Sequence, residues 1–291
     1  IGLAGGFLTP VFASRGDDNP IGLFGYVLLL DLGLLMLARR MRWPLLGALA
    51  LAGTTIYELL WMVGRMDADR VLLGLAILGV FGLLFVLATP KPVDDDSVLW
   101  RWSRFSGVLL PLVTGLWFAA NGDLGTRILP LGGLLVVLGL AAGFLARQHD
   151  EGVIALGAAA ATLGVAIVWV VQNPDLGGSP WAVSLVFVAI AAGYHAALEL
   201  EHRDEDPREN LSRTLSRAAS LAGLGLLGLL VVAGALRAFP LPPLLAGWIG
   251  IAAVLVRQAT FPGRGRVQIP AAAGVALGLV CYRLQNDAPD I

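Results

Sequence analysis

The chain has 291 residues, of which 57% are hydrophobic and only 14% are charged, and its formal net charge is −1. This is too little charge to cover the surface of a soluble protein, because soluble domains carry about 25% charged residues. The small net charge also argues against a nucleic-acid partner. The composition therefore predicts a protein embedded in a membrane.

Residues 1–14 form an apolar stretch that Gly5, Gly6 and Pro10 interrupt. Glycine and proline are unfavourable in a straight helix, so we expect a re-entrant or terminal half-helix there. A short polar loop follows, and the first long apolar run begins at Pro20.

Long apolar runs separated by short polar turns predict membrane-spanning helices, because a helix satisfies its own backbone hydrogen bonds in lipid. The sequence predicts an all-α polytopic transmembrane bundle of about ten spans plus the N-terminal half-helix. Their predicted ranges are 20–38, 43–63, 70–88, 104–120, 127–146, 152–171, 180–200, 217–236, 241–258 and 269–284. No loop between them is long enough to fold by itself. We therefore expect one integral-membrane domain over residues 1–291, and we expect it to be a piece of a longer chain.

The basic residues predict how this bundle is threaded. Fourteen of the 20 lysine and arginine residues fall in one set of alternate loops, which the positive-inside rule assigns to the cytoplasm. Both ends of the chain then face outward. We expect a multi-pass protein of the bacterial cytoplasmic (inner) membrane, with the lipid bilayer as its partner. A membrane-protein partner or a homo-oligomer stays open.

Asp31 lies at the centre of the first predicted span, among leucines. An acid at mid-membrane costs about 2.5–3.5 kcal/mol on insertion scales. Asp31 is therefore expected to face the interior of the bundle. Two interpretations are open: a proton or cation site, or a buried polar tie between helices.

Glu58 is the counterpart of that acid in the second span. At a rise of 1.5 Å per residue the two acids differ in depth by only about 7 Å. Thr54 and Glu58 are four residues apart and share a helix face. The hypothesis is an outward-opening polar pocket between the first two spans, formed by Asp31, Glu58, Thr54, Thr55 and Tyr57. The alternative is that Glu58 extends toward Arg65 and the membrane interface.

Three residues near the end of the seventh span, His195, Glu199 and His202, have a spacing that metal sites use. No further ligand is evident, and Glu199 with Arg203 also forms an ordinary i,i+4 ion pair. The sequence contains no catalytic triad, Walker lysine or HExxH motif. A G-x-G-x-x-G pattern at residues 223–228 lies inside an apolar run with no preceding strand, which favours helix packing over a nucleotide site. We expect no cofactor.

Small residues four positions apart predict where helices approach closely. Such pairs occur at Gly139 and Gly143 in the fifth span, and at Gly193 and Ala197 in the seventh. Tryptophans tend to lie at membrane interfaces, and Trp61, Trp100 and Trp169 fall near span ends.

The residues around the first span also carry a family likeness. The segments GGFLTP at residues 5–10, NP at residues 19–20 and LFGYVLLLDLGLLMLARRMRW at residues 23–43 resemble the bacterial membrane proteins grouped as domain of unknown function 2339. The matching positions are Gly5, Gly6, Phe7, Pro10, Phe24, Tyr26 and Asp31. The likeness is strongest over residues 1–65. It implies a multi-pass inner-membrane protein and a longer chain, and it implies no catalytic residue.

Three functional hypotheses remain open. The first is a transport or permease-like protein whose polar site lies at Asp31 and Glu58. The second is a membrane enzyme or accessory protein acting on lipid-linked envelope precursors; the longest outer loop, residues 172–179, is too short to cap a substrate, which counts against an enzyme. The third is a structural scaffold. A water-filled cavity at Asp31 would favour transport, a groove open to lipid would favour an enzyme, and dry packing would favour a scaffold.

Overall fold

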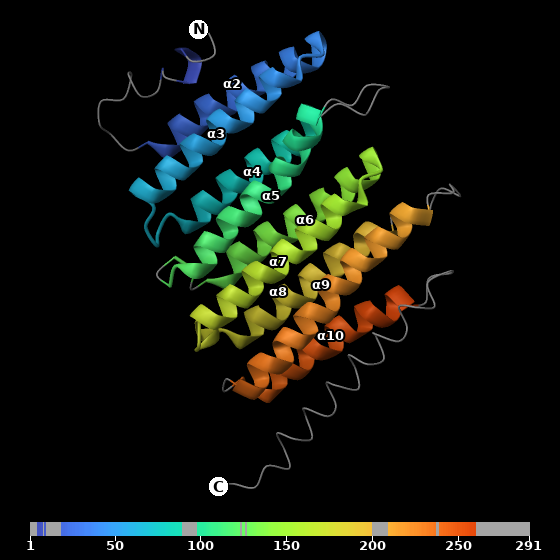
Figure 1. The fold of residues 1–291 in the computed structure, drawn as a ribbon. Coiled ribbons are helices and arrows are strands. Elements are labelled where there is room, and N and C mark those ends of the chain that lie inside the picture. Colours follow the sequence, from blue (N-terminus) through green and yellow to red (C-terminus); the bar gives the residue numbers. More distant parts are fainter. Residues whose placement is uncertain are drawn as a thin grey trace, which may run out of the picture. The chain divides into compact units, whose positions relative to one another are not determined.

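The computed structural model describes residues 5–7, 9, 19–88, 98–122, 124–125, 127–199, 209–236 and 239–259 (Figure 1). All regular structure in these ranges is helical. The helices are α2 (Pro20–Met41), α3 (Pro44–Arg65), α4 (Val71–Ala88), α5 (Val98–Ala120), α6 (Ile128–His149), α7 (Gly152–Gln172), the short 3₁₀ helix η1 (Leu176–Gly178), α8 (Pro180–Glu199), α9 (Glu209–Leu236) and α10 (Leu241–Ala259).

The helices confirm the predicted all-α polytopic bundle. Eight of them, α2 to α9, are long and apolar enough to cross a membrane, and α10 contains a shorter apolar stretch, Pro242–Gln258. They coincide with the first nine predicted spans. The tenth, 269–284, lies outside the described residues, as does most of the predicted half-helix, of which residues 5–7 and 9 are helical.

Two helices begin earlier than the sequence predicts. Helix α5 begins at Val98 rather than near residue 104, and α9 begins at Glu209 rather than near residue 217. In α9 the additional turns are amphipathic, with Leu211 and Leu215 buried. Because these residues continue the buried stripe, packing extends the helix beyond the purely apolar run.

Helix α2 is capped at both ends, and a tight turn joins its C-terminus to α3. Asn19 begins α2 by accepting a hydrogen bond from the Gly22 backbone N–H on its side-chain oxygen, at 2.9 Å, and proline occupies the first helical turn. Arg42 ends the helix in the left-handed conformation, with φ of 52°. Helix α3 begins two residues later at Pro44, so the two helices form an antiparallel hairpin.

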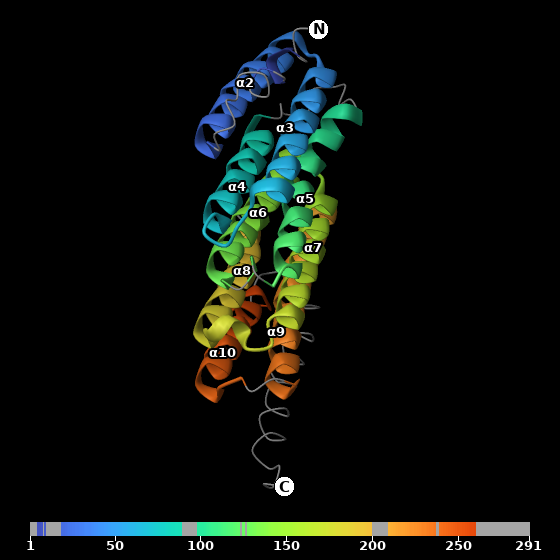
Figure 2. The same cartoon turned by 90° about the vertical axis from the view of Figure 1, so that its left-hand side faces the viewer.

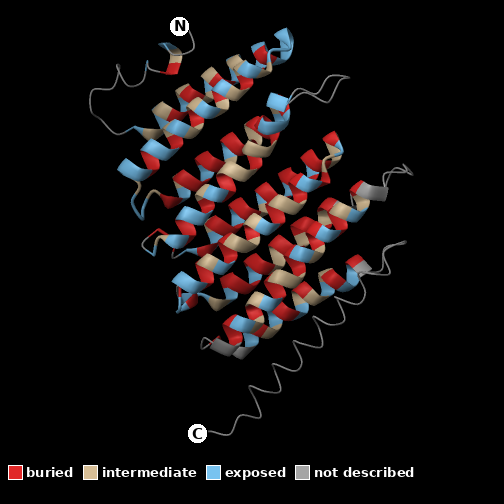
Figure 3. Ribbon diagram, in the orientation of Figure 1, coloured by how far each residue is buried: buried red, intermediate tan, exposed pale blue. Residues whose placement is uncertain are grey.

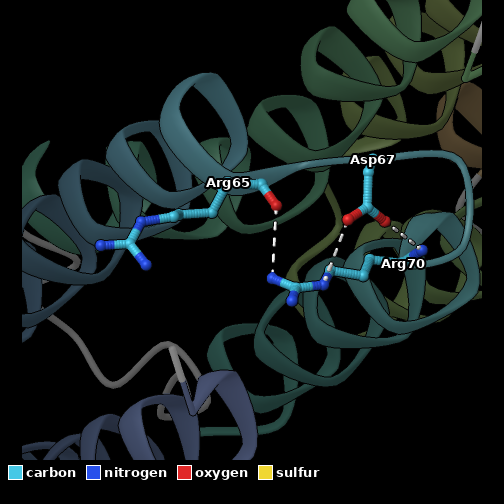
Figure 4. A network of polar contacts seen from close by, with 3 residues as sticks. All are labelled: Arg65, Asp67 and Arg70. Carbon is cyan, nitrogen blue, oxygen red and sulfur yellow. Dashed lines mark hydrogen bonds and ion pairs between the residues drawn. The ribbon is translucent and has the colours of Figure 1, made fainter. Parts of the chain in front are cut away.

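A polar network closes the next turn, between α3 and α4 (Figure 4). The Arg70 backbone N–H donates to Asp67 Oδ1 at 3.0 Å, and Arg70 Nε lies 3.4 Å from Asp67 Oδ2. The Arg70 guanidinium also donates to the Arg65 backbone oxygen at 3.5 Å. These contacts turn the chain back within five residues and set α4 beside the first two helices.

The contacts divide the chain into two compact units, residues 1–111 and residues 112–291. In the first unit α2 packs against both α3 and α4 (Figures 1 and 2). In the second unit the closest helix pairs are α6 with α8 and α7 with α9. A single domain over residues 1–291 stays a prediction.

Small residues allow the close approach of α6 and α8. A Cβ atom added to Gly143 would lie 2.5 Å from Ala197 Cβ, and one added to Gly139 would lie 3.0 Å from the Tyr194 ring. The small-residue pairs of the sequence therefore mark a real helix contact.

Buried and exposed positions run as stripes along the helices (Figure 3). The exposed stripes carry large apolar side chains, among them Met36, Leu60 and Val63. An outward apolar surface is unfavourable in water and suits hydrocarbon.

Candidate functional site

The two intramembrane acids lie on the buried faces of α2 and α3. The buried residues of α2 are Phe24, Val27, Asp31, Leu35 and Ala38, and those of α3 are Gly47, Ala50, Thr54, Glu58, Trp61 and Met62. Most of these positions recur every three or four residues, which places them on one face of each helix. The periodicity that builds the core therefore also carries both acids into it.

Two contacts fix the antiparallel register of these faces. The Thr54 hydroxyl donates to Asp31 Oδ2 at 2.5 Å. One end of the interface is closed by Phe24 and Trp61, whose rings meet edge to face with centroids 5.5 Å apart. Glu58 lies between these two contacts along α3, one turn from Thr54.

Both carboxyl groups are withdrawn from solvent. Asp31 is 0% exposed and Glu58 is 8% exposed, and the two groups are close enough to interact electrostatically. Among the described residues, Asp31 Oδ1 and Glu58 Oε1 have no hydrogen-bond partner. Buried polar atoms without a partner cost free energy. Each of these two oxygens can accept a proton or a hydrogen bond, which would remove that cost.

Trp61 adds a donor to this cluster. Its side chain is 6% exposed, and its indole N–H is buried with no hydrogen-bond partner in the described part of the chain. Trp61 follows Glu58 by three residues, on the same helix face. Its ring packs against Phe24 inside the helix pair, and the expectation that it lies at the level of the membrane interface stays a prediction.

The other two hydroxyls of the hypothetical pocket have different partners. Thr55 donates back to the Leu51 backbone oxygen of its own helix at 2.8 Å. Tyr57 donates to the Phe7 backbone oxygen. The structure thus brings Asp31 and Thr54 into contact with Glu58 nearby, while Thr55 and Tyr57 point elsewhere.

The N-terminal segment is tied to the hairpin by tyrosines. The Tyr26 hydroxyl of α2 donates to the Gly6 backbone oxygen at 2.9 Å, and Tyr57 of α3 holds Phe7 in the same way. The rings of Phe7 and Tyr57 are stacked with centroids 6.2 Å apart. One tyrosine from each helix therefore anchors the segment.

This segment crosses the hairpin at the level of the acid. The Phe7 ring covers Gly53 so closely that a Cβ atom there would lie 2.7 Å from it, and Gly6 faces Leu30. Leu30 precedes Asp31 and Gly53 precedes Thr54 in the chain. The segment therefore lies against the hairpin at the level of the hydrogen bond between Asp31 and Thr54.

Two recesses are described in the first unit. One recess there, of about 410 Å³, lies between α3 and α5 and has Thr55, Ser103 and Ser106 as its polar lining. A second, of about 630 Å³, lies along the C-terminal half of α2. Neither is lined by Asp31 or Glu58.

Glu58 is only 8% exposed and lies among the buried residues of α3. This favours the interpretation that Glu58 belongs to the interior of the hairpin.

The histidine cluster of the seventh span is only partly described. His195 is buried in α8, whereas the Glu199 side chain and the whole of His202 lie outside the described residues. Within the described ranges no group of three His, Cys, Asp or Glu side chains could hold a metal ion. Metal binding by His195, Glu199 and His202 stays a prediction.

The sequence alone could have placed Trp61 beside Glu58, because the spacing of Thr54, Glu58 and Trp61 puts all three on one helix face. No comparable signal reveals that Phe7 docks on Gly53, because that contact joins distant parts of the chain.

Comparison with known proteins supports the membrane assignment. A family described as predicted membrane proteins (DUF2339) matches residues 1–290, far beyond the 65 residues on which the likeness is strongest. No curated protein and no solved structure matches the chain. The multi-span helical fold and the match over nearly the whole length together establish that the chain belongs to the DUF2339 family of predicted membrane proteins.

Proposed function

We propose that the chain is the membrane part of a permease-like transport protein in which Asp31 and Glu58 bind and release a proton. The observation that carries this proposal is the pair itself. Two carboxyl groups lie on facing helices, each with one oxygen that has no partner among the described residues. Acids inside a membrane are costly, and proton relays are one of the uses for which they are retained.

The chemistry of the pair follows from its surroundings. Two carboxylates close together in an apolar environment resist being ionised at the same time, so the pair holds a proton as a unit. The Thr54 hydroxyl stabilises one oxygen of Asp31. The Trp61 N–H lies on the same helix face as Glu58 and has no partner among the described residues.

A second candidate is a packing function, in which the acids only tie the hairpin together. The complete burial of Asp31 and its hydrogen bond to Thr54 favour it. The two candidates differ in one physical property. A proton site must exchange its proton with water, whereas a packing tie keeps it.

Infrared spectroscopy of the purified full chain in lipid measures this exchange. Protonated buried carboxyl groups give carbonyl bands, which Asp31→Asn and Glu58→Gln assign by their disappearance. We expect these bands to shift promptly on transfer to heavy water and to change with pH. Thr55→Val, one residue from the hydrogen-bonded threonine, serves as the control and leaves them unchanged. Bands that neither exchange nor titrate would refute proton binding and establish the packing function.

We also propose that the protein lies in a bacterial inner membrane, with its arginine-rich loops in the cytoplasm and both ends of the chain outside. The unequal distribution of basic residues between alternate loops supports this orientation. Single cysteines placed at Arg42 and at Asp67, in a background without Cys281, test it. We expect a membrane-impermeant thiol reagent to label only the second from outside intact cells. Labelling of the first would reverse the orientation.

A further inference from the structure

A recess of about 630 Å³ runs along the C-terminal half of α2. Among the described residues it is lined by Leu32, Gly33, Leu35, Met36, Arg39 and Arg40. A Cβ atom added to Gly33 would meet no other atom within 4 Å, so the space beside this residue is open. Leu32 and Met36 are exposed on either side of it. The part of the recess beside Leu32, Gly33 and Met36 is therefore an apolar trough.

The end of the same recess at the C-terminus of α2 is strongly basic. Arg39 and Arg40 occupy the last turn of α2 and are exposed, and no ion pair of either is found in the described part of the chain. Arg42 follows directly at the end of the helix. Two adjacent cations thus lie beside the apolar trough, and no acidic side chain of the described ranges forms an ion pair with them.

The position of these cations matches the headgroup level of a bilayer. Trp43 comes next in the chain and is 55% exposed, as is typical of tryptophans at the membrane interface. From Leu32 to Arg40 the helix rises by about 12 Å. The trough therefore runs from the headgroup level into the hydrocarbon region.

We propose that this recess binds an anionic phospholipid. Its phosphate pairs with Arg39 and Arg40, which can each donate two hydrogen bonds to phosphate oxygens. One acyl chain lies along Leu32, Gly33 and Met36. Basic recesses beside membrane helices are suited to anionic headgroups. The apolar trough favours a lipid over a free phosphate, because a free phosphate has no acyl chain to fill it.

The charges disfavour a second copy of the chain as the occupant. In a two-fold symmetric dimer formed through this face, the same patch would contact itself. Arg39 and Arg40 of one copy would then face the same arginines of the other, and like charges repel. An anionic lipid has the complementary charge. The site lies apart from the proton site proposed above and does not depend on it.

Native mass spectrometry of the detergent-solubilised full chain tests this assignment, with phosphatidylglycerol and phosphatidylcholine titrated separately. A basic residue near an anionic surface contributes about 1 kcal/mol. We therefore expect Arg39→Gln with Arg40→Gln to weaken phosphatidylglycerol binding about 30-fold and to leave phosphatidylcholine binding nearly unchanged. Gly33→Leu, which fills the trough without altering charge, should weaken binding of phosphatidylglycerol by at least fivefold.

Two matched variants serve as controls. Arg42→Gln removes a charge from the same helix end but outside the recess, and Gly25→Leu adds a side chain at another open position of the same helix. We expect both to retain binding within twofold of the unaltered protein. If Arg42→Gln weakens phosphatidylglycerol binding about fivefold, as the loss of one surface charge would, the lipid senses surface charge only and the site is refuted. A Gly33→Leu variant that binds normally, or that loses a dimer instead of a lipid, also refutes it.

Discussion

The hydrogen bond from Thr54 to Asp31 is the contact on which the buried hairpin can be tested most directly. Thr54→Val removes the hydroxyl and keeps the branched shape of the side chain. Thr54 is 1% exposed and Asp31 is 0% exposed, so water has no access to replace the lost donor. The carboxyl then keeps both oxygens in an apolar interface without a partner from this helix.

The magnitude follows from that burial. Leaving a buried acceptor without its donor costs about 1–3 kcal/mol in proteins generally. Hydrogen bonds between membrane helices average about 0.6 kcal/mol and reach about 1.7 kcal/mol. Because both partners of this bond are fully buried, we expect Thr54→Val to lower the free energy of unfolding by about 1.5 kcal/mol.

The neighbouring threonine provides a matched control. The Thr55 hydroxyl bonds only to the Leu51 backbone oxygen of its own helix, a local bond that adds little to helix stability. We expect Thr55→Val to change the free energy of unfolding by less than about 0.5 kcal/mol. The two substitutions remove the same atoms from adjacent residues and differ only in what the hydroxyl contacts.

Reversible unfolding of the full chain in mixed lipid–detergent micelles, driven by SDS and followed by circular dichroism, measures both values. Asp31→Leu combined with Thr54→Val completes the set, because replacing both partners with apolar groups removes the unpaired acceptor. We expect this double variant to be more stable than Thr54→Val alone. Equal losses for Thr54→Val and Thr55→Val, or a double variant weaker than Thr54→Val, would refute the reasoning.

Two further predictions concern packing. Gly53→Ala should lower the free energy of unfolding by about 1–3 kcal/mol, because its Cβ would lie 2.7 Å from the Phe7 ring, whereas Gly64→Ala at an open position should be neutral or slightly stabilising; thermal melts in detergent compare the two. Trp169→Phe should cost about 1–3 kcal/mol, since the buried indole N–H donates to a backbone oxygen in the turn after α5. Trp181→Phe, at an exposed ring, should cost less than about 0.5 kcal/mol in the same melts.

The helical spans could be predicted from the sequence because hydropathy is a local property. A run such as Val71–Ala88 is apolar throughout, and only a helix can place it in lipid without unpaired backbone groups. The burial of Asp31 could be predicted for the same reason, from the cost of an acid facing hydrocarbon. Helix ends were less predictable where amphipathic turns continued the buried face, as at Glu209.

The internal arrangement of the candidate site needed the structure. Thr54 and Thr55 are indistinguishable by composition, yet about 100° of helix rotation separates them and only Thr54 meets the acid. The register that pairs Thr54 with Asp31 depends on the left-handed conformation of Arg42 in the turn. Nothing in the sequence assigns that conformation to an arginine, which adopts it rarely.

The tight turn at Arg42 also bears on how the protein enters the bilayer. Only Arg42 and Trp43 separate α2 from α3, so the first helix cannot be released far into lipid before the second follows. We therefore expect the pair to insert as one hairpin, with the Asp31 carboxyl entering the bilayer together with its hydroxyl donor. A longer linker at this point would uncouple the two insertion events and leave the acid alone in hydrocarbon while it waits for Thr54.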